Sequence, residues 1–268
     1  MTAAPEFTSG AAYRQAMTKL SVNVNKIATL RNTRANGIPD VVRLAGIALD
    51  AGADGITVHP RPDQRHIRIE DVDAVAALLA GRHGAEYNIE GNPFHGLVEH
   101  CERVRPTQAT LVPDRREAFT SNHGWNLVEL DADQTRALSA AIARLHASGC
   151  RVSLFVDPIP QMMKLAKAIG ADRVELYTEP YADEFGRGRE QAAVAGYVTA
   201  AAEARGVGLG VNAGHDLNLD NLGLFLACVH GVDEVSIGHA LIADALELGL
   251  AATVRRYRAL CVGSVVAR

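Results

Sequence analysis

Three residues with acid–base side chains each stand at the end of a short apolar run. His59 follows the run 56–58, Glu90 ends a second run, and His215 follows a third, glycine-containing run. Imidazole titrates near neutral pH, and burial raises the pKa of a carboxyl group toward the same range. If the fold brings these three side chains together, they can act as general acids and bases.

Glycine-containing segments follow the last two apolar runs. They read Gly214-His215-Asp216 and Gly238-His239. Glycine lets the backbone approach an anion closely, and backbone N–H groups at the start of a helix bind phosphate. These segments therefore predict one phosphate site.

Cationic side chains point to a second anion site. The segment 55–68, GITVHPRPDQRHIR, contains Arg61 and His66, and Arg34 lies in an earlier loop. Two anion sites beside acid–base groups suit two phosphorylated substrates or one bisphosphate. The other two arginines of the segment are expected to be solvated charges.

Metal binding and Schiff-base catalysis are alternative uses of these groups. The spacings HxH, HExxH and HxxxH, which are typical of metal sites, do not occur in the sequence, so no metal is predicted. Lys26 could form a Schiff base, as in an aldolase, but an anion contact is the preferred interpretation. The candidate ligands of a metal-dependent lyase would be His59, His66, His215, His239, Glu90 and Asp157.

Apolar runs of strand length alternate with helical patterns along most of the chain. Strands are predicted at 20–26, 55–58, 87–90, 109–112, 151–157, 174–177, 208–214 and 234–237. Helices are predicted at 39–50, 71–81, 93–104, 133–148, 159–169, 190–204, 219–230 and 240–260. Eight such units in about 240 residues fit a (β/α)8 TIM barrel.

The predicted domain organisation is one barrel at 20–268 behind an extension at 1–19. The extension is expected to be partly disordered, with a short helix at 11–18. A long polar segment follows the fourth strand and contains Thr120. The Rossmann and P-loop glycine motifs are absent from the positions where they would bind nucleotides.

Strand alternation divides the barrel residues into two sets. One set, including Val22, Ile56 and Leu154, is apolar and is expected to face the helices. The other set is polar and must face the axis. It comprises Asn23, Asn25, Thr57, His59, Asn88, Glu90, Ser153, Asp157, Glu175, Tyr177, Asn212, Ser236 and Gly238. An axis this polar predicts an active-site cavity at the C-terminal mouth, because burying such groups for packing alone is costly.

Composition limits the partners and the compartment. The 268 residues are 48% hydrophobic and carry a net charge of −4, with no basic block, so neither nucleic acid nor a membrane is expected as a partner. No apolar run reaches membrane-spanning length, and the N-terminus does not resemble a signal peptide. The four cysteines are widely spaced, which indicates reduced thiols and a cytoplasmic location.

Several sequence blocks, taken together, resemble the pyridoxine 5'-phosphate synthase family. They are VNVNKIATLRN, GADGITVHPRPDQRHI, NIEGNP, TLVPD, VNAGHDL and SIGHALI, in this order between about 20 and 250. The resemblance implies a (β/α)8 barrel assembled as a homo-octamer, without metal or redox cofactor. It implies condensation of 1-deoxy-D-xylulose 5-phosphate with 3-amino-2-oxopropyl phosphate to pyridoxine 5'-phosphate, phosphate and water.

The resemblance also implies individual roles. His59 and Glu90 would be acid–base residues and His215 a proton donor. The aminoketone phosphate would be bound by Asn23, Arg34, Asp216, Gly238 and His239. The deoxyxylulose phosphate would be bound by Asn25, Lys26, Arg61, His66 and Thr120, the last on a segment that could act as a lid.

The sequence departs from the family pattern at two places. The first block commonly reads VNIDH, whereas this chain has Asn25 and Lys26 at its last two positions. Asp216 stands where the family usually has glycine, and its carboxylate would repel phosphate unless it points away. Two other functions stay open: a sugar-phosphate aldolase or metal-dependent lyase, and a non-catalytic sensor of phosphorylated metabolites.

Overall fold

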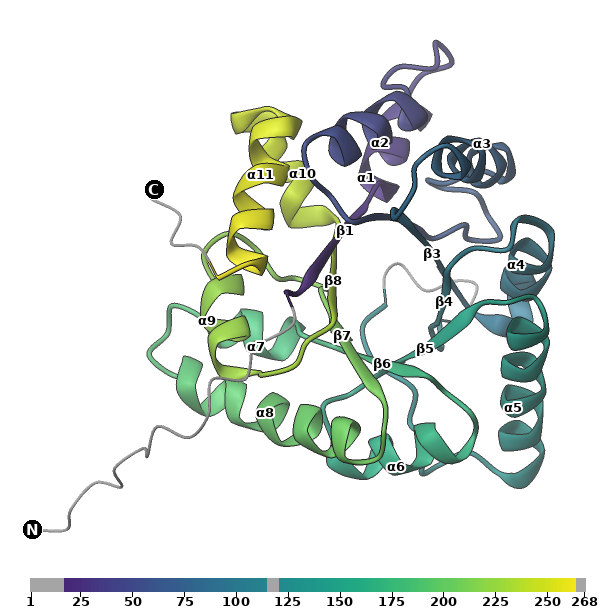
Figure 1. The fold of residues 1–268 in the computed structure, drawn as a ribbon, viewed down its shortest axis with the longest axis vertical. Coiled ribbons are helices and arrows are strands. Elements are labelled where there is room, and N and C mark those ends of the chain that lie inside the picture. The colour runs from purple at the N-terminus through teal and green to yellow at the C-terminus, as the bar shows by residue number, and fades with distance from the viewer. Residues whose placement is uncertain (1–16, 115–120, 264–268) are drawn as a thin grey trace, which may run out of the picture.

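A closed barrel of eight parallel strands forms the centre of the molecule. The computed structural model describes residues 17–114 and 121–263. Each strand pairs with the next, and β8 pairs with β1 (Figure 1). The strands are β1 (Lys19–Asn23), β2 (Gly55–Val58), β3 (Glu86–Gly91), β4 (Gln108–Leu111), β5 (Arg151–Val156), β6 (Arg173–Leu176), β7 (Gly210–Ala213) and β8 (Glu234–Ile237).

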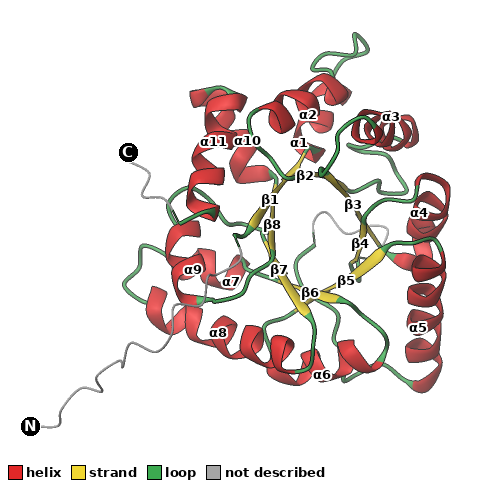
Figure 2. Ribbon diagram, viewed as in Figure 1, coloured by secondary structure: helices red, strands yellow, loops and turns green. Residues whose placement is uncertain are grey.

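Helices surround this barrel on the outside (Figure 2). They are α1 (Asn25–Asn32), α2 (Val41–Asp50), α3 (Ile69–Ala80), η1 (Pro93–Leu97), α4 (Val98–Val104), α5 (Ala132–Ala147), α6 (Pro160–Ala168), α7 (Glu179–Glu184), α8 (Glu190–Gly206), α9 (Leu222–Cys228), α10 (His239–Leu248) and α11 (Leu250–Cys261). The predicted (β/α)8 barrel is confirmed. No helix of 17–114 or 121–263 is long and apolar enough to cross a membrane.

The two sides of the barrel wall differ in polarity as the alternation predicts. Val22, Ile56 and Leu154 are fully buried in the apolar layer between strands and helices. On the axis, the Thr57 hydroxyl lies within hydrogen-bond distance of the Ser21 hydroxyl, at 2.7 Å. The axis therefore holds a network of polar side chains where many barrels pack aliphatic ones.

Three elements differ from the prediction. The first strand ends at Asn23, and the expected loop after it begins as helix α1, because the chain turns at Val24. The short helix α7 begins directly after Thr178, where only a loop was expected. The last predicted helix is two helices, separated at Gly249, whose φ of 79° interrupts the helical backbone.

The long segment after β4 is present as predicted within its described parts, 112–114 and 121–131, which contain neither helix nor strand. Trp125 anchors it, since the indole N–H donates to the Leu111 carbonyl at 3.0 Å. The predicted helix at 11–18 and Thr120 lie outside the described residues, except for 17 and 18 at the end of that helix.

Candidate active site

A cavity of about 510 Å³ opens at the carboxyl ends of the strands. In barrel enzymes this end carries the active site. Most of the predicted site residues line it: Asn23, Asn25, Lys26, His59, Arg61, His66, Glu90, His215, Asp216, Gly238 and His239. These residues belong to five of the eight strands or to the loops after them, so the fold brings together groups that are far apart in the sequence.

Glu90 and His59 form the centre of the acid–base group. The Nδ1 atom of His59 lies 3.9 Å from Oε2 of Glu90. The same carboxylate oxygen accepts from the Asn23 amide at 3.3 Å, and Oε1 accepts from the Ser236 hydroxyl at 3.4 Å. The carboxyl group is therefore held by neutral donors, with an imidazole as its nearest basic neighbour.

Burial changes the protonation of both side chains. Loss of water raises the pKa of Glu90 to about 7. Burial also lowers the pKa of His59 well below its usual value, and the charges of Arg61, His66 and Arg65 add to that effect. At neutral pH, therefore, His59 is a neutral imidazole, while Glu90 exchanges its proton readily.

His215 differs from His59 because it has a carboxylate partner. Its Nδ1 atom is paired with Oδ2 of Asp216, and its ring packs against Phe155 and Tyr177, with centroids 6.3 and 5.9 Å away. Burial alone would lower the pKa of His215, but the hydrogen bond to Asp216 and the charges of Asp216 and Glu90 raise it above its usual value. His215 is thus the more readily protonated of the two histidines.

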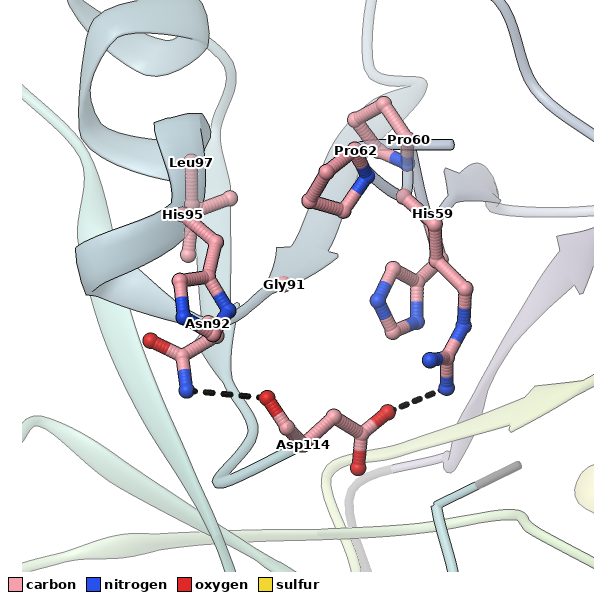
Figure 3. Close-up of a pocket in the computed structure, with 9 residues that line it drawn as sticks. His59, Pro60, Pro62, Gly91, Asn92, His95, Leu97 and Asp114 are labelled. Atoms are coloured by element: carbon pink, nitrogen blue, oxygen red, sulfur yellow. Dashed lines mark hydrogen bonds and ion pairs between the residues drawn. The ribbon is translucent and has the colours of Figure 1, made fainter. Parts of the chain in front are cut away.

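Arg61 and His66 occupy the side of the cavity after β2. Arg61 forms a buried ion pair with Asp114. The amide of Asn92 donates to the Asp114 carbonyl at 3.1 Å (Figure 3). The Ser121 hydroxyl donates to the Asp114 carboxylate at 2.7 Å. A small cavity lies beside this group, lined in part by His59.

His66 is a neutral hydrogen-bonding group in this position. Burial, followed by the charges of Arg61 and Lys26, lowers the pKa of His66 to about 4. The backbone N–H of Ile67 donates to its Nδ1 at 2.9 Å, so the neutral ring carries its proton on Nε2.

The turn after β1 connects the first strand to His59. The side-chain oxygen of Asn25 accepts the backbone N–H of His59 at 2.9 Å. Lys26, the next residue, lines the cavity at the start of α1.

Two glycines allow strand ends to approach one another closely. A Cβ on Gly214 would lie 2.0 Å from the Ser236 carbonyl oxygen, and the φ of Gly214 is +156°. A Cβ on Gly238 would lie 3.1 Å from the Asn23 side chain. Gly238 also precedes α10, so the first backbone N–H groups of that helix lie at the cavity, as an anion site requires.

Some predicted residues lie elsewhere. Arg34 is exposed and does not line the cavity of its own chain. Asp157, a candidate ligand of the alternative metal site, accepts the backbone N–H of Gly124 at 3.1 Å. Arg65 lines the cavity and pairs with Asp63, although a solvated charge was expected.

Glu175 is a cavity residue to which the sequence analysis gave no role. Burial, with the charges of Glu90 and Glu234, raises the pKa of Glu175 well above its usual value and so favours the protonated form. Its Oε2 atom has no hydrogen-bond partner among the described residues. Strand alternation predicts that Glu175 faces the axis. How deeply its carboxyl group is buried, and therefore how far its pKa is raised, depends on the neighbouring strands. Glu179, at the start of α7, was missed because that helix was not predicted.

The described part of the chain contains no cluster of side chains arranged to bind a metal ion. Within residues 17–114 and 121–263, no three His, Cys, Asp or Glu side chains are grouped as a metal ion would need.

Comparison with known proteins gives matches over most of the chain. Residues 20–263 match the family described as "Pyridoxal phosphate biosynthesis protein PdxJ". A protein of Albidiferax ferrireducens named pyridoxine 5'-phosphate synthase is 56% identical over 245 residues, which are 90% of this chain and 96% of that protein. A protein of the same name from Xanthomonas oryzae pv. oryzae is 54% identical over 256 residues, covering 93% and 98%.

Solved structures with low sequence identity share the fold. Tryptophan synthase of Mycobacterium tuberculosis has a TM-score of 0.60 at 14% identity and covers 92% of this chain and 93% of that one. Thiamine phosphate pyrophosphorylase of Pyrococcus furiosus has a TM-score of 0.57 at 16% identity, with 91% and 95% covered. At such identities the likeness concerns the barrel alone.

Proposed function

Since the chain belongs to the family of pyridoxal phosphate biosynthesis proteins PdxJ, we propose that it condenses 1-deoxy-D-xylulose 5-phosphate with 3-amino-2-oxopropyl phosphate. The products are pyridoxine 5'-phosphate, inorganic phosphate and water. The chain is an enzyme of vitamin B6 biosynthesis, as its relatives of more than half identical sequence are.

The observation that carries the proposal is the meeting of Glu90, His59 and His215 in one cavity. Imine formation, dehydration, loss of phosphate and ring closure each move protons without changing the oxidation state of the protein. Such a sequence needs groups that both give and take protons near neutral pH. A carboxyl with a pKa of about 7 beside a neutral imidazole, and a more basic imidazole nearby, meet that need.

The three groups take different roles in the proposed reaction. Glu90 and neutral His59 accept protons from the amine and the carbon atoms of the condensing substrates. Protonated His215 gives a proton to a leaving oxygen.

Two sets of groups would bind the two phosphates. For the aminoketone phosphate they are Asn23, Arg34, Asp216, Gly238 and His239; support comes from the start of α10 behind Gly238. For the deoxyxylulose phosphate they are Asn25, Lys26, Arg61, His66 and Thr120; support comes from the cationic and N–H groups after β1 and β2. Arg34 lies outside the cavity of its own chain, so its contact would require movement or another copy.

An aldolase using Lys26 is the enzyme alternative that one observation favours, because this lysine lines the cavity. Borohydride added with either substrate would trap a Schiff base and add mass to the peptide containing Lys26. The synthase proposal expects no such adduct, since here Lys26 binds phosphate as a cation.

The direct test combines the purified protein with both phosphates. The absorbance of pyridoxine 5'-phosphate and the release of inorganic phosphate should rise together, and neither should rise when one substrate is omitted. Folded protein that forms no product under these conditions would refute the proposal. We further propose that the protein acts in the cytoplasm as a homo-octamer, a location supported by its four free cysteines.

A further inference from the structure

The turn after β7 has a feature that the reaction roles above do not use. Asp216 adopts a φ of +66°, in the left-handed region that side chains other than glycine, asparagine and aspartate rarely occupy. It is one of three such non-glycine residues among those described, and it is the only one of the three that follows a proposed catalytic residue directly. This conformation turns its carboxylate back toward the preceding side chain.

Hydrogen bonds from neighbouring elements hold the turn in place. The hydroxyl of Thr178 donates to the His215 carbonyl, and the Asn221 amide donates to the Asp216 carbonyl at 3.2 Å. Within the turn, the N–H of Leu217 donates to the carbonyl of Gly214 at 3.0 Å. The backbone on both sides of the His215–Asp216 pair is thereby fixed.

The side chains of this pair are also fixed. Oδ2 of Asp216 is paired with Nδ1 of His215, while the imidazole ring is packed against Phe155 from β5 and Tyr177 after β6. Since Nδ1 is occupied, only Nε2 is free to exchange a proton with a molecule in the cavity.

We propose that Asp216 is a positioning residue that holds His215 as an imidazolium with Nε2–H directed to the bound substrate. The inference rests on the proposed function and adds a residue to it. In the transfer, the Nε2–H bond breaks, its electron pair stays on Nε2, and the proton joins the leaving oxygen. His215 keeps the proton on Nδ1, bonded to Asp216, until solvent restores the proton on Nε2.

Other charged groups around His215 do not replace Asp216. The titratable groups that face the imidazole are Asp216 on its own loop, Glu90 from β3, Tyr177 after β6 and Glu179 from α7. Glu90 is itself only partly ionised near neutral pH, because its own pKa is about 7. Of these groups, Asp216 is the one bonded to the ring, and its hydrogen bond and charge are the largest influences that oppose burial.

The pairing with His215 also keeps the Asp216 carboxylate from repelling a bound phosphate. A carboxylate that faced the start of α10 would oppose an anion there, whereas this carboxylate is bonded to an imidazole. Removal of the Asp216 carboxylate should therefore reduce proton donation while leaving phosphate binding largely intact, because this residue would contact the phosphate through its backbone N–H.

Two substitutions test this role without disturbing the turn. Asp216→Asn keeps the shape and tolerates positive φ, and Asp216→Gly removes the side chain at a position that favours glycine. Asp220→Asn removes an exposed charge from the same loop, and Arg105→Gly relieves a positive φ of 49° at the distant end of α4; both serve as controls.

The first measurement is independent of turnover. Diethyl pyrocarbonate reacts with neutral imidazole, so the rate of modification at His215, followed by peptide mass spectrometry against pH, reports its titration. Both Asp216 variants should react at His215 at lower pH than the wild type, and both controls should match the wild type. Identical profiles in wild type and Asp216→Asn would overturn the proposal.

The second measurement is the pH dependence of kcat and KM for both substrates. The high-pH decline of activity should move to lower pH in both Asp216 variants, with kcat reduced on the order of tenfold at pH 8 and KM nearly unchanged. A shifted titration with an unchanged pH profile would refute a positioning role. If no variant and no wild-type protein forms product, the proposed function fails, while the modification profile still decides whether Asp216 controls His215.

Discussion

The protonation order of Glu90 and His59 is reversed from that in water. A free carboxyl group ionises well below the pH at which imidazole loses its proton. Here burial raises the pKa of Glu90 to about 7 and lowers that of His59, with the cations Arg61 and Arg65 lowering it further. A neutral acid can thus stand beside a neutral base, which is what repeated proton transfer requires.

Replacing Glu90 by glutamine tests this pair. The amide oxygen can still accept from the Asn23 amide, and the amide N–H can donate to the Ser236 hydroxyl, but the glutamine side chain cannot exchange a proton. We expect kcat to fall about 10²- to 10⁴-fold, with both substrates still bound at similar concentrations. Steady-state kinetics and calorimetric titration of each phosphate measure these effects. Unchanged turnover would exclude Glu90 from the mechanism.

The same substitution should stabilise the protein at alkaline pH. Because the folded pKa of Glu90 is about 7 and the ordinary value is 4.5, folded Glu90 keeps a proton that the unfolded chain releases, and stability falls as pH rises through this window. Ionising Glu90 in the folded protein therefore costs about 3 kcal/mol more than ionising it in the unfolded chain. Glu90→Gln should therefore unfold at higher denaturant concentration than wild type at pH 8.

That difference should shrink to less than about 1 kcal/mol at pH 5, where folded Glu90 is already neutral. The lowered pKa values of His59 and His66 act in the opposite direction, since these histidines favour the fold as pH rises toward 6.5. They are present in both proteins, so the comparison isolates Glu90. A stability difference between Glu90→Gln and wild type that is the same at pH 5 and pH 8 would contradict the raised pKa of Glu90.

Strand alternation was sufficient to identify His59 and Glu90 from the sequence. Their pKa values could not be predicted, because these depend on depth and on cations brought from other loops. The pairing of the Asp216 carboxylate with His215 could not be predicted either, because it depends on the φ of +66° that Asp216 adopts in the turn. Arg34 illustrates the limit of motif transfer: its sequence context matched the family, but its side chain lies outside the cavity.

At the scale of elements, helix α1 is joined to α3 by a buried ion pair. Arg31 donates to both carboxylate oxygens of Asp71, and its Nη2 also reaches the carbonyl of His66 at 3.2 Å. Asp71 in turn accepts the N–H of Arg68 at 2.8 Å at the start of α3. Helix α1 was not predicted from the sequence, and neither was this connection, which positions the loop carrying His66.

Asp71→Asn should weaken both the fold and the cavity. It leaves the buried Arg31 guanidinium without its counter-charge, a change that costs roughly 3–5 kcal/mol. We expect a lower midpoint of denaturant unfolding and a higher KM for the deoxyxylulose phosphate, because the His66 loop loses its anchor. Asp73→Asn on the same helix breaks an exposed pair with Arg103 and should cost less than about 1 kcal/mol. Equal effects of the two substitutions would show that the ion pair does not hold the loop.

At the scale of the whole molecule, Thr57 is the centre of the polar axis. Its hydroxyl contacts Ser21 at 2.7 Å, Ser236 at 3.1 Å and Asn88 at 3.3 Å. Thr57→Val removes one hydrogen-bond partner from each of these three buried groups and should lower the free energy of unfolding by about 2–4 kcal/mol. Thr253→Val is the matched control, because Thr253 is equally buried but bonds only a helix carbonyl, that of Gly249. A loss no larger than in this control would mean that the axis network adds little stability.

Three large exposed apolar side chains lie on α10, on α1 and just before α2. Leu246 on α10 is 78% exposed, Leu30 on α1 is 53% exposed, and Ile38 before α2 is 68% exposed. Helix α1 contacts both α10 and α2, and the three helices lie on one side of the barrel (Figure 1). Exposed side chains of this size are costly in water, so we propose that they are covered by other copies of the chain in the expected octamer.

Leu246→Glu should therefore dissociate the assembly, because a carboxylate cannot be buried in an apolar contact without a partner. Light scattering after size-exclusion chromatography should give a mass eight times that of the single chain for the wild type and a smaller one for the variant. Val198→Glu places the same charge on α8, where the side chain is 39% exposed, and should keep the wild-type mass. A monomeric wild type, or equal dissociation by both substitutions, would refute the assignment of this surface. Because Arg34 also follows α1, dissociation should raise KM for the aminoketone phosphate if another copy supplies that arginine.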